Sequence, residues 1–152
     1  MRPARAAVAA ATAATAVTGG LATDPGSAWF ADLAKPRWYP PAATFGLAWS
    51  ALYAGLAWAG GEVLTRSAAP PAPFRRALAV NLALNAAWPP LFFRTHRLAA
   101  ATAESAVLAV SSADLVRRAL PVSRAAAGAL VPYAAWTAFA TALSGSIARR
   151  NR

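Results

Sequence analysis

Five long stretches with almost no charged residues limit what this chain can fold into more than any other feature. Four of them contain no charged residue, and the fourth along the chain contains one, Glu104. They cover residues 6–23, 42–61, 77–93, 98–113 and 125–148. A helix that crosses a bilayer needs about 20 apolar residues, with a range of about 17–25. The fourth stretch reaches this length if its ends extend toward Arg97 and Asp114. The pattern therefore predicts five transmembrane helices.

The composition favours a membrane protein over an ordinary soluble domain. Hydrophobic residues make up 58% of the chain and charged residues 13%, against about 45–50% and about 25% in soluble proteins. Helices are expected rather than strands, because Ala dominates the stretches and strict alternation is absent. The predicted fold class is all-α, an integral membrane bundle of five transmembrane helices. We expect a single domain, 1–152, with spans near 6–23, 42–64, 75–94, 97–117 and 123–148.

Three alternatives compete with this interpretation. The first stretch follows Met-Arg-Pro-Ala-Arg and is rich in Ala and Thr, which is also typical of a cleavable signal peptide. A soluble Ala-rich bundle is a second alternative, although five such runs are hard to bury in so small a protein. The net charge of +10 suggests nucleic acid as a partner. However, the basic residues form small groups at the ends of the stretches, as in multi-span membrane proteins, and not one stripe.

The bilayer is therefore the expected partner, and nucleic acid is not. With five spans, eight Lys and Arg residues fall on one side and seven on the other. This near balance indicates no orientation, and the sequence does not specify which membrane holds the protein.

The loop between the first two stretches, residues 24–41, is unusually aromatic. It contains Trp29, Phe30, Trp38 and Tyr39 among Pro, Lys and Arg residues. Amphipathic rings are stable at a membrane interface or against other apolar groups. We therefore expect this loop to cover one end of the bundle as a lid.

Aromatic residues also share one face of the second stretch. Phe45, Trp49 and Tyr53 recur every four residues, which places them on the same side of a helix. The fifth stretch repeats the pattern with Tyr133, Trp136, Phe139 and Ala140. Such faces either pack against neighbouring helices or line a ligand site, and the spacing alone leaves both open.

The third stretch carries two amides on one face. Asn81, Asn85 and Trp88 are four and three residues apart. An amide without a partner in hydrocarbon costs several kcal/mol. Both Asn side chains must therefore face the bundle interior, where another helix or a ligand can meet them. Pro89 and Pro90 should kink or end this helix.

Few residues in the chain suit conventional catalysis. Glu104 is a carboxylate within a span, which by default is a functional hypothesis, with pairing to a basic residue or to Thr102 as the plainer alternative. His96 is the only histidine and the chain has no cysteine. No Ser-His-Asp set, thiolate nucleophile or metal-ligand cluster can be drawn. No metal site and no required cofactor are expected.

Four separated motifs resemble the TspO/MBR family of translocator and tryptophan-rich sensory proteins. The first lies in the loop, and the others lie in the second, third and fifth stretches. The matching residues are Trp29-Phe30, Lys35-Pro36, Trp38 and Pro40-Pro41; Phe45-Gly46, Trp49 and Leu52-Tyr53; Asn81-Leu82-Ala83-Leu84-Asn85 and Trp88-Pro89; and Pro132-Tyr133-Ala134-Ala135-Trp136 with Phe139-Ala140.

The resemblance implies a five-helix membrane protein, usually a homodimer, with a pocket roofed by the first loop. Its ligands would be tetrapyrroles such as porphyrin or haem, and in some members cholesterol or benzodiazepine-type compounds. The implied ligand-binding residues are Trp38, Phe45, Trp49, Tyr53, Asn85, Trp88, Trp136, Phe139 and Ala140. Some members are reported to degrade porphyrin in light, and the tryptophans that match Trp49 and Trp136 are linked to that activity.

The sequence departs from the family pattern at several positions. Leu47 replaces the usual Pro, Asn81 the usual Gln, and Ala109 the usual Trp of the fourth helix. The sterol-associated pattern has no match at the carboxyl end, which lowers the expectation for cholesterol. The favoured function is tetrapyrrole binding with a sensory or ligand-handling role. The alternatives are light-dependent porphyrin degradation, transport of porphyrin or sterol-like molecules, and a ligand-free structural role.

Overall fold

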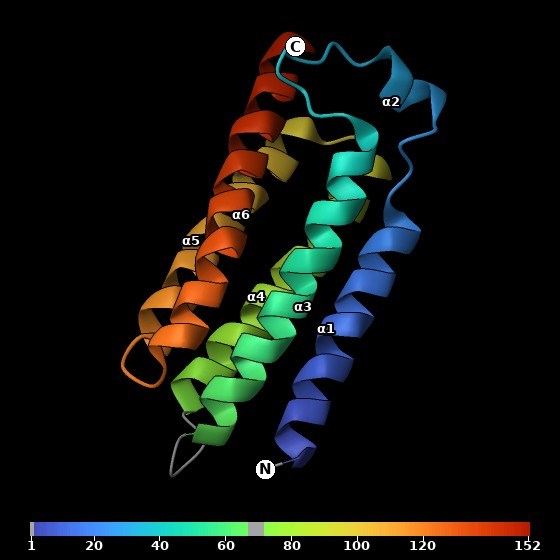
Figure 1. Ribbon diagram of the computed structural model, residues 1–152. Coiled ribbons are helices and arrows are strands. Elements are labelled where there is room, and N and C mark those ends of the chain that lie inside the picture. The colour runs from blue at the N-terminus through green and yellow to red at the C-terminus, as the bar shows by residue number, and fades with distance from the viewer. Residues whose placement is uncertain (1, 67–71) are drawn as a thin grey trace.

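A computed structural model describes residues 2–66 and 72–152 as helices and short connections (Figure 1). Within these residues there is no strand, which agrees with the predicted all-α class. The predicted connection between the second and third spans lies partly outside the described residues. The helices are α1 (Arg2–Ala22), α2 (Ala28–Asp32), α3 (Ala42–Arg66), α4 (Ala72–Phe93), α5 (Leu98–Ala119) and α6 (Arg124–Arg150).

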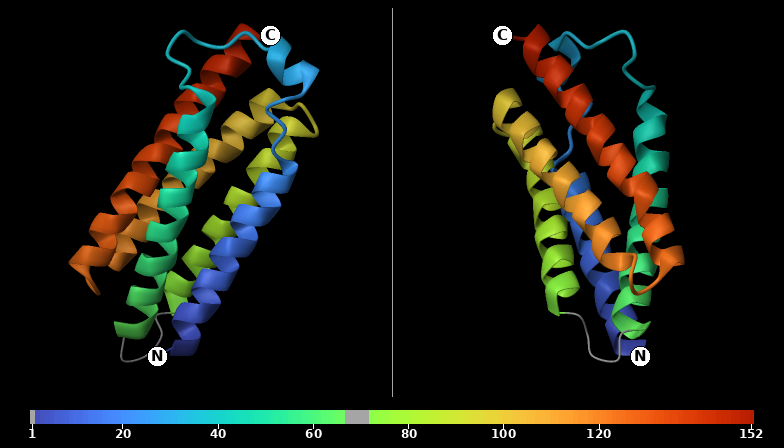
Figure 2. Two further views of the ribbon diagram at one scale, coloured as in Figure 1. Left: turned by 45° about the vertical axis from the view of Figure 1, so that its right-hand side comes forward. Right: turned by 90° about the vertical axis from the view of Figure 1, so that its left-hand side faces the viewer.

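The five long helices form a closed ring. Its order is α1, α3, α6, α5 and α4, and α4 packs back against α1. Figures 1 and 2 show α3 between α1 and α6, with the loop that contains α2 over the end of the bundle where the chain ends. This order places side chains from α3, α4, α5 and α6 around a common interior.

Length alone would let each of the five long helices cross a bilayer. The shortest, α1, has 21 residues, and a helix rises about 1.5 Å per residue against a hydrocarbon core of about 30 Å. Among the described residues, two helices, α5 and α6, also pass a hydropathy test, each with a mean hydropathy of 1.3. The Ala-rich composition explains the low values, because Ala is less apolar than Leu or Ile. The number of five spans stays a prediction.

Large apolar side chains also point outward from the ring. Leu21, Leu47 and Val110 are each more than 70% exposed. A soluble bundle would have to leave these side chains in water, whereas lipid accommodates them without cost. The outer surface is therefore suited to a bilayer.

Two details of local structure go beyond the sequence analysis. A kink or an end was expected at Pro89 and Pro90, and the helix does not end there, because α4 continues to Phe93. Phe92, which is only 2% exposed, packs against Trp88 at a ring distance of 4.8 Å, so tertiary contacts hold the last turn in place. The lid is not only loop, because it contains the short helix α2. Ser27 caps this helix by accepting a hydrogen bond from the Phe30 amide.

Side chains of α1 and α4 pack closely against the backbone of α3 at Gly60. A Cβ atom added at Gly60 of α3 would lie 2.9 Å from Cγ1 of Val8 and 3.1 Å from Cδ2 of Leu78. Near the same end of α1, Nη2 of Arg5 donates to Oε2 of Glu62 over 2.8 Å. Gly60 therefore allows α1, α3 and α4 to meet.

A bulky residue at this contact should destabilise the bundle. We expect Gly60→Leu to lower the free energy of unfolding by about 1–3 kcal/mol, because overpacking a filled contact has this cost. Thermal unfolding in detergent micelles, followed by circular dichroism, measures the loss. Gly128→Leu is the matched control, since no atom lies within 4 Å of its Cβ position. Equal melting temperatures for the two variants would contradict the close approach.

Candidate functional site

A chain of hydrogen bonds crosses the interior of the ring. Oη of Tyr53 on α3 donates to Oδ1 of Asn85 on α4 over 2.6 Å, and Nδ2 of Asn85 donates to Oη of Tyr133 on α6 over 2.9 Å. Oη of Tyr133 donates to Oδ1 of Asn81 over 2.7 Å, and Nδ2 of Asn81 reaches Oγ of Ser112 on α5 at 3.1 Å. Four helices are thus joined through side chains.

These contacts give both amides partners within the protein. Asn81 is fully buried and Asn85 is 4% exposed, as their helical face predicted. Both amides are satisfied by protein groups, so interhelical hydrogen bonding is sufficient to explain them. A ligand is not needed as their partner. The network instead joins α3, α4, α5 and α6 next to the aromatic residues of α3 and α6.

Aromatic rings line the contact between α3 and α6. Trp49 stacks on Tyr53 with ring centroids 5.4 Å apart, and its ring meets Trp136 edge-on at 6.4 Å. Trp136 also lies 5.9 Å from Phe45 and 5.2 Å from Phe139. Six of the predicted ligand-binding residues thus form one continuous series, which we call the aromatic wall: Trp38, Phe45, Trp49, Tyr53, Trp136 and Phe139.

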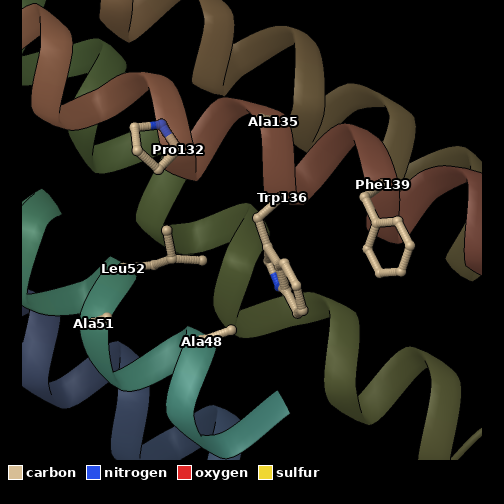
Figure 3. A pocket seen from close by; sticks show the side chains of 7 residues that line it. All are labelled: Ala48, Ala51, Leu52, Pro132, Ala135, Trp136 and Phe139. Carbon is tan, nitrogen blue, oxygen red and sulfur yellow. The ribbon is translucent and has the colours of Figure 1, made fainter. Parts of the chain in front are cut away.

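An open groove of about 540 Å³ lies beside this wall, and two residues of the wall, Trp136 and Phe139, line it. In Figure 3 the indole of Trp136 extends from α6 toward Ala48 of α3, with Phe139 beside it. All side chains that line the groove are apolar: Ala48, Ala51, Leu52, Pro132, Ala135, Trp136 and Phe139. Small residues on both helices leave room next to large rings, so the groove offers a flat molecule an apolar face.

Ring contacts hold the lid against the bundle, and hydrogen bonds within the lid stabilise its own conformation. Trp29 stacks on His96 at 3.9 Å, and Tyr39 lies 5.4 Å from Phe45. Nζ of Lys35 donates to the carbonyl oxygens of Phe30 and Leu33 within the lid. Partial burial raises the pKa of Tyr39 above its ordinary value. Trp38 connects the lid to the aromatic wall through Phe139, 5.8 Å away.

Comparison with known proteins agrees with this arrangement. The sequence profile of the TspO/MBR family matches residues 7–150. The chain belongs to the TspO/MBR family. The resemblance inferred from the four motifs is thereby confirmed. Since this family is membrane-embedded, the protein is an integral membrane protein.

Similar proteins come from animals and bacteria. The human protein named Translocator protein is 34% identical over 132 residues, which cover 83% of this chain and 76% of that protein. The protein of Cereibacter sphaeroides named Tryptophan-rich sensory protein is 33% identical over 142 residues, covering 93% of this chain and 87% of that protein. The protein of Bacillus cereus named Tryptophan-rich protein TspO is 30% identical over 119 residues.

Two other residues predicted as TspO/MBR ligand contacts lie apart from the series of ring contacts. Trp88 stacks on Phe92 under the lid, and its Nε1 is buried without a hydrogen-bond partner among the described residues. Ala140 is half-buried on α6, one turn after Trp136. The departure at Leu47 is outside the wall, because this side chain is 75% exposed on the outer surface.

Glu104 on α5 lacks the partner that the plainer alternative expected. In the part of the chain that the structure describes, neither carboxylate oxygen accepts a hydrogen bond, although both are buried. Glu104 shares its helix face with the buried Ala101 and Leu108. Burying a carboxylate without a hydrogen-bond partner is costly in free energy. Both oxygens of Glu104 are in this situation.

Sequence reasoning did not include every polar residue of the interior. Ser111 and Ser112 both accept from Nδ2 of Asn81, at 3.2 and 3.1 Å. Helical spacing could have indicated Ser112, because it is eight residues after Glu104 and falls on the same side of α5. Within the described residues no group of three His, Cys, Asp or Glu side chains comes together.

Proposed function

We propose that this protein binds a tetrapyrrole, or a similarly flat apolar molecule, against the aromatic wall, and that all five long helices span the membrane. The observation that carries this proposal is the apolar groove of about 540 Å³ beside Trp136. Its volume is within the range of about 300–1,000 Å³ typical of small-molecule sites. Indole and phenyl faces stack on planar conjugated ligands.

Charge supports an orientation for such a ligand. The groove has no polar lining, so it offers no partner to a carboxylate, and burying an unpaired carboxylate is costly. Porphyrin propionates would therefore point toward the lid, where Arg37 is exposed. The ammonium group of Lys35 is already engaged by two carbonyls of its own loop. Arg37 is therefore the favoured counter-ion within the lid.

The names of the relatives support a sensory or ligand-handling role. The words translocator and sensory describe the human and Cereibacter sphaeroides proteins. For this chain they favour binding as the shared property, with transport or signalling as its consequence. A homodimer is part of the proposal, as the family resemblance implies.

Quenching of tryptophan fluorescence by protoporphyrin tests the proposal directly. The chain has six Trp residues, of which Trp38, Trp49 and Trp136 lie in the wall, so bound porphyrin should quench emission in a saturable manner. We expect saturation at micromolar porphyrin in detergent micelles. A linear, unsaturable decrease, equal to that of free tryptophan, would contradict a binding site.

Light-dependent degradation is the second candidate, favoured by the edge contact between Trp49 and Trp136 beside the groove. The same samples distinguish it from binding alone. Porphyrin absorbance that falls in light but not in darkness, and does so more slowly in Trp136→Phe, would support degradation. Stable absorbance in light with saturable quenching would support binding alone.

A further inference from the structure

A second cavity lies on the other side of α6, between its last turns and the beginning of α5. Its volume is about 460 Å³. Three basic side chains line it, His96, Arg149 and Arg152, together with the polar Thr102 and Asn151. The remaining lining residues are small or apolar, among them Gly145. We call it the α5–α6 cleft, and it shares no lining residue with the groove beside the aromatic wall.

The cleft is strongly basic and its cations are not neutralised. Ion pairs among the described residues join Arg5 and Arg66 to Glu62, and Arg117 and Arg118 to Asp114, all near the opposite end of the bundle. None of these pairs includes a residue of the cleft, and none of the lining residues is acidic. Two guanidinium groups therefore remain available for an anion.

The position of the cleft indicates where that anion comes from. His96 stacks on Trp29 of the lid, so the cleft lies at the level of the aromatic residues that cover this end of the bundle. Trp and Tyr residues typically mark the interface between membrane and water. Cavities lined by basic residues between transmembrane helices bind anionic lipid headgroups. A phosphate at this level belongs to the bilayer itself.

The shape of the cleft suits a lipid better than a free ion. A Cβ atom at Gly145 would lie 3.4 Å from Cγ2 of Thr102 and 3.5 Å from Nη1 of Arg149. The absence of a side chain at Gly145 therefore keeps the floor of the cleft open between the two helices. The floor also includes Leu98 and Ala148, so polar groups and apolar groups meet in one cavity. A headgroup can contact the arginines while the start of an acyl chain covers the apolar floor.

We propose that the α5–α6 cleft binds the headgroup of an anionic phospholipid from the surrounding bilayer, with Arg149 and Arg152 as its phosphate contacts. Arg presents a planar set of donors that matches phosphate in a bidentate manner. Asn151 is partly occupied, because its amide bonds the backbone of Ala34 in the lid. A lipid bound here would therefore contact residues directly connected to the lid.

The test compares lipids on the intact, detergent-solubilised protein. We expect phosphatidylglycerol to raise the melting temperature in a saturable manner, while phosphatidylcholine and inorganic phosphate do not. The double variant R149Q/R152Q should weaken the apparent affinity for phosphatidylglycerol by at least about tenfold, since each basic residue near an anionic surface contributes about a factor of five. The matched control is Arg150→Gln, a neighbouring exposed arginine that does not line the cleft.

Each outcome decides the proposal. Equal shifts with phosphatidylcholine, or equal losses in Arg150→Gln and the double variant, would overturn it. An equal shift with inorganic phosphate alone would show an anion site without lipid selectivity. If R149Q/R152Q fails to fold, R149K/R152K keeps the positive charge but loses the paired donors of the guanidinium groups, so it should retain part of the phosphatidylglycerol effect. Complete loss of this effect in a folded R149K/R152K would exclude a charge-based site. None of these measurements depends on porphyrin binding.

Discussion

Trp136→Leu is expected to weaken protoporphyrin binding by roughly tenfold, because an aromatic stacking partner contributes about 0.5–1.5 kcal/mol beyond its apolar area. Trp136 is the residue that joins the two halves of the aromatic wall. Its ring contacts Phe45 and Trp49 on α3 and Phe139 on α6. It also lines the groove directly. Leucine keeps an apolar side chain at this position but removes the flat surface.

The measurement is the dissociation constant from quenching of the remaining tryptophans. Trp58→Leu is the matched control, since Trp58 is on the same helix as Trp49 but half exposed and outside the groove. It should leave the dissociation constant unchanged. Equal constants for wild type and Trp136→Leu would refute the wall as the binding surface, and equal weakening in both variants would indicate a general effect on the bundle.

Much of the architecture could be predicted from the sequence because it depends on local pattern. Uncharged runs and helical periodicity located the long helices, and the cost of burying an amide placed Asn81 and Asn85 in the interior. The order of helices around the ring could not be predicted in the same way. Short connections set the direction of neighbouring helices, but several ring orders satisfy that condition.

Two serines of the interior were not identified from the sequence, because a serine has more than one possible hydrogen-bond partner. Ser111 and Ser112 lie in an Ala-rich helix, where a serine can bond its own backbone, and Oγ of Ser112 does donate to the carbonyl of Leu108. Only the structure brings Asn81 within reach of it. The sequence also does not show what Lys35 bonds, and in the structure its ammonium group donates to two carbonyls of its own loop.

At Pro89 and Pro90, local backbone preference and tertiary packing favour different conformations. Pro89 and Pro90 lack the amide hydrogens that a helix needs, which favours an end to the helix. The packing of Phe92 against Trp29 and Trp88 outweighs this preference, so α4 continues beneath the lid. The last turn of α4 thus contributes an aromatic surface to the lid that local propensity alone would have excluded.

Among substitutions that remove one atom, we expect the largest loss in the free energy of unfolding at Tyr133. Its Oη accepts from Nδ2 of Asn85 and donates to Oδ1 of Asn81, and the residue is fully buried. Tyr133→Phe removes both bonds and leaves two buried amide atoms, Nδ2 of Asn85 and Oδ1 of Asn81, without these partners. Each unsatisfied group costs about 1–3 kcal/mol in proteins, and interhelical bonds in membranes average about 0.6 kcal/mol. We therefore expect a loss of about 2 kcal/mol.

Thermal unfolding in micelles measures this loss, which corresponds to roughly 4–8 °C for a chain of this size. Tyr53→Phe is the control, because it removes one bond, to Oδ1 of Asn85, from a half-buried residue. Its effect should be no more than half as large. If Tyr133→Phe melts at the wild-type temperature, water or an alternative partner must satisfy the amides, and the interior is not the closed polar network that joins four helices. A loss confined to Tyr133→Phe would instead identify this hydroxyl as the centre of that network.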